Sequence, residues 1–339
     1  MKKLASKLDH FSLSCRQTGL SLVELMISLT IGLILLAGIT TLIVQQSTTR
    51  REMEKSSRQI ENGRYAMEIL HDDIEHAGFY GDYSPPRNAT YTVPADPCDT
   101  TPANQGWSAA TSPITAPVAV QGYAGAASNP APSTCSSLIT NYQPNTDILI
   151  IRRMASTAVD PATAVAGVTY LQAKRCNTDG PSFQFGTSNF TLRQKDCVTP
   201  ALLYGYIVRI YYISSCSVVT GSTCADSIPT LKMVEFMNGA QTTIPLVEGI
   251  EDMQFDYGID TTSDGAPDSY ASAPTAANWP NIMTVRVNLL ARNNEATPGY
   301  TDNKTYTLGD AASVTPGGSF KRHAYSQLIR LTNPSGRRE

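Results

Sequence analysis

An acidic loop near the middle of the second half of the chain has side chains that suit a hard cation. The stretch DTTSDGAPDSY, residues 260–270, alternates oxygen-bearing side chains and contains Gly265. A loop of this kind can wrap Ca²⁺ at about 2.3–2.6 Å. The predicted ligands are Asp260, Thr262, Asp264, the carbonyl of Ala266, and Asp268. The alternative is an Asp-Gly turn between two strands. Calcium is favoured, because converging acidic groups need a reason to lie together.

A second group of possible ligands is the stretch HDDIEH, residues 71–76. On a helix it pairs His71 with Glu75 and Asp72 with His76, each four residues apart. No third dedicated ligand is evident, so a solvated helix face is a better interpretation than a metal site.

The cysteines are the third group of residues that could take part in chemistry. Cys15 precedes a long apolar run, and the other six cysteines all follow it. An even number without C-x-x-C spacing favours disulfides in an oxidising compartment over zinc, with 15 possible connectivities. Sequence proximity favours three pairs, which are Cys98–Cys135, Cys176–Cys197 and Cys216–Cys224.

No pattern in the chain predicts an enzyme. The sequence contains no G-x-S-x-G, P-loop or H-E-x-x-H motif. Charged residues are 16%, the net charge is −3, and no basic patch is interleaved with aromatic residues. A nucleic-acid partner is therefore not expected. A length of 339 residues suits one large or two ordinary domains.

The N-terminus combines a basic leader with an apolar run that holds a single carboxylate. Residues 20–44 have one charge, Glu24, and are long enough to span about 30 Å of hydrocarbon as a helix. The leader should stay cytoplasmic and the remainder should face outward. An ordinary secretory signal has an A-x-A-like cleavage site after the apolar core. Here VQQSTTRREME follows, residues 44–54, so a plain signal peptide fits poorly.

This N-terminus resembles a class III prepilin signal. The matching residues are Gly19, then Leu20, Ser21, Leu22, Val23 and Glu24. The resemblance implies that a prepilin peptidase cuts after Gly19, methylates the new amine of Leu20, and leaves the helix in place. Most members have Phe where this chain has Leu20.

The same resemblance implies a purpose for Glu24. A carboxylate within a membrane span costs about 2.5–3.5 kcal/mol unless it finds a partner. The implied partner is the N-terminal amine of a neighbouring subunit, whose pairing would set the stagger between adjacent helices. The alternative is that Glu24 snorkels to the membrane interface.

The helical pattern continues beyond the apolar run as far as Ala77, with Gly78 as a C-cap. Read as one element, residues 20–77 would extend about 87 Å. An apolar seam is predicted at Met53, Ser56, Ile60, Gly63, Met67, Leu70, Ile74 and Ala77. Gly32, Gly38 and Gly63 permit either local bending or close packing.

An irregular connection and then a β-rich region follow. Residues 84–145 hold ten of the 21 prolines, which predicts a long irregular connection. The resemblance to pilins implies that it is surface decoration, and the alternative is a partly disordered segment. From residue 146 onward, alternating apolar runs predict mostly antiparallel strands. These runs are 146–153, 205–214, 230–236, 244–259, 281–292 and 324–333. An α+β fold follows, with one spine helix packed on an antiparallel sheet.

This region is similar to PilW-type minor pilins, which share a helix ending like DDIEHAGFYG (72–81), a strand like WPNIMTVRVNLLAR (279–292) and a closing strand ending near RLTN (330–333). The resemblance implies a type IV pilin-like fold. The predicted segments are a cleaved leader (1–19), a transmembrane and filament-core helix (20–44), its amphipathic second half (45–78), a Pro/Ala/Ser/Thr-rich loop (79–145) and a disulfide-stapled β-sheet domain (146–339).

The function implied is that of a minor pilin, which primes or caps the type IV pilus and supports adhesion and twitching. Its partners would be other minor pilins, the major pilin, a tip adhesin, prepilin peptidase and the inner membrane. The C-terminal domain would be periplasmic and later on the surface pilus. Without residues 1–19 the chain has 22 basic and 28 acidic residues, which gives no support for DNA uptake by charge. The alternatives are a J-type pseudopilin of type II secretion and, in another class, a signal-anchored periplasmic enzyme or binding protein.

Overall fold

The computed structural model describes residue 19 and residues 21–221 and 223–339. The chain divides into two compact units, Met1–Met53 and Glu54–Glu339. The boundary falls inside the predicted segment 45–78, and the predicted loop and β region belong to one unit.

Helix α1, Leu22–Glu75, contributes to both units. It begins two residues after the predicted start and ends two residues before the predicted end. The chain leaves the helix through Gly78, whose φ is +72° and whose N–H donates to the carbonyl of Arg152 at 2.9 Å. Glycine suits this position because it adopts positive φ without a Cβ clash.

The larger sheet of the second unit has seven strands, all paired in antiparallel fashion. Five lie in the order β11-β10-β7-β4-β3, while β5 joins β7 and β6 joins β5. Their bounds are β3 (Val120–Tyr123), β4 (Ile148–Val159), β5 (Tyr170–Ala173), β6 (Phe183–Gly186), β7 (Leu203–Ser214), β10 (Thr230–Met237) and β11 (Ala240–Glu248). The central strands β4 and β7 are buried on both faces, so their apolar runs are nearly continuous.

The second sheet is antiparallel in the order β13-β12-β14-β15. Its strands are β12 (Ile250–Ile259), β13 (Ser269–Ala271), β14 (Ile282–Arg292) and β15 (Arg322–Arg330). The predicted run 244–259 is therefore two strands in different sheets. They divide at Gly249, whose φ is +79°. The α+β prediction is confirmed, although the β region forms two main sheets rather than one.

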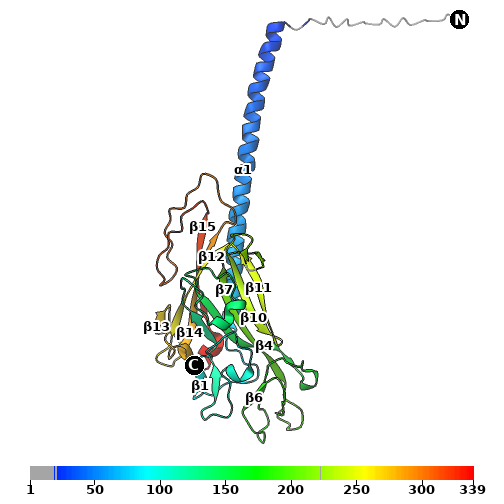
Figure 1. The fold of residues 1–339 in the computed structure, drawn as a ribbon, viewed down its shortest axis with the longest axis vertical. Helices are drawn as coiled ribbons and strands as arrows, with labels where there is room; N and C mark the ends of the chain where they lie inside the picture. The colour runs from blue at the N-terminus through cyan, green and yellow to red at the C-terminus, as the bar shows by residue number, and fades with distance from the viewer. Residues whose placement is uncertain (1–18, 20, 222) are drawn as a thin grey trace, which may run out of the picture. The chain divides into compact units, whose positions relative to one another are not determined.

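The lower part of α1, from Gln59 to its end at Glu75, packs against both sheets (Figure 1). Met67, Leu70 and Ile74 share a core with residues of β7, β12 and β14. The predicted seam is correct from Gly63 downward. Above Gly63 it is wrong at Met53 and Ile60, which are 64% and 41% exposed, while Ser56 is half-buried and Gln59 is buried. The amide of Gln59 donates to the carbonyls of Ala291 and Lys321, which explains why a polar residue holds this place.

The segment 79–145 is folded onto the outer face of the larger sheet. Tyr80, Trp107 and Ile139 are buried in a second core with residues of β4 and β7. It also contributes β1 (Thr90–Thr92), β2 (Thr115–Pro117) and β3. Among the described residues, the remaining short elements are a hairpin of β8 (Val219–Thr220) and β9 (Thr223–Cys224), four 3₁₀ turns at Pro102–Asn104, Ser133–Ser137, Pro161–Thr163 and Trp279–Asn281, and α2 (Thr332–Gly336).

Candidate assembly interface

The residues of the prepilin-like signal lie at the start of α1. Gly19 is exposed and precedes the helix, while Leu20 lies outside the described residues. Glu24 is exposed in the first helical turn. An acid in this turn interacts favourably with the helix dipole. No basic side chain of the described chain forms an ion pair with Glu24, so the charge is available to a partner.

The helix around Glu24 is apolar on every side. Leu22, Val23 and Leu25 are 75%, 62% and 51% exposed, and the large apolar side chains as far as Val44 are all more than half exposed. By length and composition α1 can cross a membrane, although a signal sequence near an N-terminus passes the same test. A helix apolar all round is stable in a membrane or packed among other apolar helices.

The lower part of α1 is held to the larger sheet by a buried charge network. The carboxylate of Asp73 is 1% exposed and accepts hydrogen bonds from Arg153 Nε at 2.8 Å, Arg209 Nη1 at 2.8 Å and the Tyr211 hydroxyl at 3.0 Å. Arg209 also donates to Glu235 at 2.8 Å. Burial opposes the charge of Arg209, but Asp73 and Glu235 outweigh it and raise its pKa.

The role of Asp73 was not predicted from the sequence. A signal was present, because Leu70, Asp73 and Ala77 share one helix face and both arginines stand in apolar strand runs. The exposed neighbours follow the predicted solvated face. His71 Nδ1 lies 3.8 Å from Glu75, and His76 Nδ1 lies 3.6 Å from Asp72. The network holds the helix against the larger sheet through donors from two strands of that sheet.

The acidic loop joins β12 to β13 as a closed turn. The carboxylate of Asp268 accepts from the N–H and hydroxyl of Thr261 at 2.6 and 2.7 Å, and these bonds lower its pKa. Asp264 accepts from the N–H of Ala266 at 2.9 Å. The carboxylates are thus directed at their own backbone. The loop's Thr262 donates to both Asp260 and Asp268.

A basic side chain occupies the place that a cation would need beside Asp260. The Arg338 Nη1 lies 2.9 Å from Oδ2 of Asp260, which is itself fully buried. Burial alone would raise the pKa of Asp260, but Arg338 and the N–H groups of Gly265 and Ser263 hold it below its usual value. As arranged, these residues do not fit a calcium ion, which needs several unpaired oxygens pointing inward. Calcium binding here stays a prediction.

Another group with metal-ligand atoms close together among the described residues is Asp96, Cys98 and Cys135. The two sulfurs form a disulfide, so they are not available as ligands. The other bridges join Cys176 to Cys197 and Cys216 to Cys224. These are the pairs favoured by sequence proximity. Cys15 lies outside the described residues.

Two family models match this chain. Residues 14–40 match the prokaryotic N-terminal methylation motif, which includes Gly19 and Glu24. Residues 210–333 match PilW, described as type IV pilus-assembly protein W, and this range runs from β7 to the start of α2. No curated protein and no solved structure matches the chain. The two matches confirm the resemblance to a PilW-type prepilin-like protein and support a role related to type IV pilus assembly.

Proposed function

We propose that this chain is a minor pilin that primes assembly of the type IV pilus or caps it. The single observation that carries the proposal is the uncovered apolar helix with Glu24 in its first turn. Such a surface needs lipid before assembly and the helices of other subunits after it. The match to a pilus-assembly family favours this role over a secretion pseudopilin.

The mechanism follows from the chemistry of the N-terminus. After cleavage behind Gly19, the amine of Leu20 on one subunit would carry a positive charge close to the apolar helix. Pairing with Glu24 of its neighbour would remove the cost of keeping a carboxylate in a low-dielectric bundle. The register of the pair would fix how far adjacent helices are staggered. The second unit would remain outside, in contact with other minor pilins, the major pilin or a tip adhesin.

The test replaces Glu24 by Gln, which keeps the shape and removes the charge. The amount of this chain in sheared pili should fall at least about tenfold, the equivalent of 1.4 kcal/mol. Glu54→Gln is the matched control, because it removes the same charge from an exposed position on the same helix. Normal incorporation of Glu24→Gln would overturn the proposed role.

Mass spectrometry of the mature protein checks the processing step separately. The expected N-terminus is a methylated Leu20, in the wild type and in both variants. An intact chain beginning at Met1 would contradict the proposal. A cleaved and methylated Glu24→Gln chain that is absent from pili would show that the charge acts in assembly rather than in processing.

A further inference from the structure

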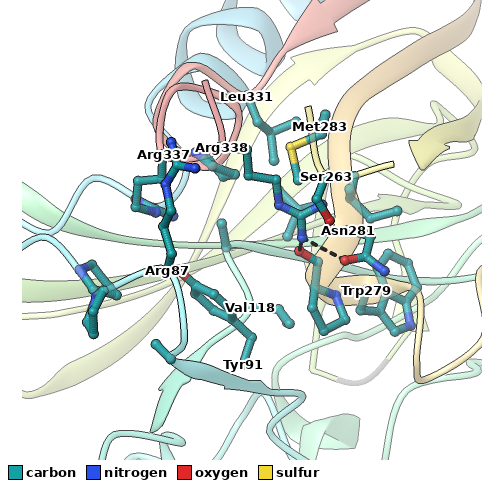
Figure 2. A pocket seen from close by; sticks show the side chains of 18 residues that line it. Arg87, Tyr91, Val118, Ser263, Trp279, Asn281, Met283, Leu331, Arg337 and Arg338 are labelled. Carbon is teal, nitrogen blue, oxygen red and sulfur yellow. Dashed lines mark hydrogen bonds between the residues drawn. The ribbon is translucent and has the colours of Figure 1, made fainter. Parts of the chain in front are cut away.

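A cavity of about 310 Å³ lies in the second unit, between the 85–91 loop, the 3₁₀ turn Trp279–Asn281 and the C-terminal tail. Figure 2 shows Arg87 and Arg337 on one side of it and Trp279 with Asn281 on the other. This volume is at the lower end of the range for sites that bind small organic molecules. None of the residues that line it belongs to the Asp73 network.

The charged side chains that line this cavity are all basic. Three arginines line it, Arg87, Arg337 and Arg338, and no acidic side chain does. Asp260 neutralises Arg338, which also donates to the Pro280 carbonyl at 3.0 Å and to Asn281 at 2.6 Å. Arg338 is therefore part of the wall.

The other two arginines have no carboxylate partner in the described chain. Arg337 donates to the carbonyl of Gly78 at 3.1 Å and lies over the ring of Tyr80 at 5.4 Å. Arg87 is exposed on the loop and makes no ion pair with any described residue. Two guanidinium groups without an anion favour a negatively charged ligand, since arginine binds carboxylates through paired hydrogen bonds.

Apart from Ser263 and Asn281, the rest of the wall is mostly apolar and partly aromatic. Val118, Met283 and Leu331 are buried and lie next to the cavity, and Trp279 is 9% exposed. The Trp279 ring is held by an edge contact with Tyr257 at 4.8 Å, so it is a fixed surface. Tyr91 adds a second, half-buried ring. A ligand that fits must place an apolar body here, because burying polar groups without partners is unfavourable.

We propose that this cavity binds an organic anion in which a carboxylate is attached to an aromatic or branched apolar group. The carboxylate would lie between Arg87 and Arg337, and the apolar group would lie between Trp279 and Tyr91. The same chemistry is offered by a free organic acid and by the carboxyl end of a polypeptide whose last residue is apolar.

The two tryptophans of the chain allow a direct test. The full-length protein in detergent is labelled with 5-fluorotryptophan, which gives one ¹⁹F NMR signal from Trp279 and one from Trp107. The probe is 3-phenylpropionate, and its neutral control is 3-phenylpropionamide. We expect 3-phenylpropionate to shift the Trp279 signal in a saturable way while the Trp107 signal stays in place. The amide partitions into detergent at least as well, so it controls for that effect.

Arg87→Ala is the decisive variant, because Arg87 is exposed and forms no ion pair with any described residue. It should weaken binding of 3-phenylpropionate about tenfold or more. Arg50→Ala removes the same charge from an exposed position on α1 and should leave the affinity unchanged. No saturable Trp279 shift, an equal shift with the amide, or an equal affinity in Arg87→Ala would each overturn the proposal.

A final arm separates the two sources of the ligand. The tripeptide Gly-Gly-Phe is titrated with a free and with an amidated C-terminus. Tighter binding of the free form than of 3-phenylpropionate would assign the cavity to the end of a partner polypeptide. Weaker binding than 3-phenylpropionate would assign it to a free organic acid.

Discussion

The two parts of helix α1 meet opposite requirements with the same backbone. From Leu22 to Val44 its large side chains are apolar and more than half exposed, and its charge is confined to Glu24. From Gln59 to Ile74 one face is buried against two sheets, and that face includes the carboxylate of Asp73. In both parts, a carboxylate on an otherwise apolar helix face indicates a group of opposite charge that pairs with it. For Asp73 the partner lies within the chain, and for Glu24 we propose that it lies in another subunit.

The largest effect should come from removing the buried charge. Asp73→Asn leaves Arg153 and Arg209 without their shared carboxylate, and breaking a buried pair in this way costs about 3–5 kcal/mol. Urea unfolding of the full chain, followed by tryptophan fluorescence, measures the loss. The neighbouring Asp72→Asn is the control and should change stability by less than about 0.5 kcal/mol, because Asp72 is exposed. Equal effects of the two substitutions would mean that Asp73 does not dock the helix.

A smaller loss of stability is expected when a glycine in the buried part of the helix is replaced by alanine, and no loss when a glycine in the exposed part is replaced. A Cβ on Gly63 would lie 2.2 Å from the Tyr325 ring, while one on Gly38 would meet nothing within 4 Å. Gly63→Ala forces Tyr325 to move and weakens its hydrogen bond to the Ile60 carbonyl, at a cost of about 1–3 kcal/mol.

Gly38→Ala should leave the unfolding midpoint of the second unit unchanged and raise helix propensity by up to about 1 kcal/mol. Both variants are measured by the same urea titration. A neutral Gly63→Ala would show that the close approach to Tyr325 is not needed for packing.

The stability of the second unit should also depend on pH through Asp147. This buried side chain accepts from the N–H groups of Gly125 at 2.7 Å and Phe255 at 2.8 Å, yet burial raises its pKa to about 7. Between about pH 4 and 7, the folded state therefore holds a proton that the unfolded state, with a pKa near 3.8, has already released. Stability should therefore fall as the pH rises through this window, by up to about 1.4 kcal/mol per pH unit.

Asp147→Asn removes this proton from both states. Melting temperatures of the variant between pH 4 and 7 should show a smaller decrease with rising pH than those of the wild type. Comparing slopes rather than absolute values allows for any packing defect that the substitution introduces. Parallel curves for the two proteins would contradict the assignment to Asp147.

The smallest effect is expected on the solvated face of the docked helix. His71 and Glu75 form an exposed pair 3.8 Å apart, and such pairs contribute about 0–0.5 kcal/mol. Glu75→Gln should change the urea midpoint within the error of the measurement, at pH 6 as well as at pH 8. A loss near that of Asp73→Asn would show that this face is covered rather than solvated.

Much of the fold could be predicted from local patterns. The long helix and the strands β4, β7, β10 and β14 follow from short-range periodicity, which depends only on neighbouring residues. The split at Gly249 was missed because the apolar run continues across it, and only the backbone turn reveals the change of sheet. The exposure of Ile60 was also missed, since periodicity gives a helix face without saying how far up the covering sheet extends.

The apolar helix, the position of Glu24, the N-terminal methylation motif and the even number of cysteines after the apolar run can all be recognised without a structure. These features depend on composition and spacing within a few turns of chain. The fold alone brings Asp73 to two arginines 80 and 136 residues away, and Asp260 to Arg338, 78 residues further along the chain. The sequence does not show what a carboxylate will contact, because its partner depends on how distant segments of the chain pack together.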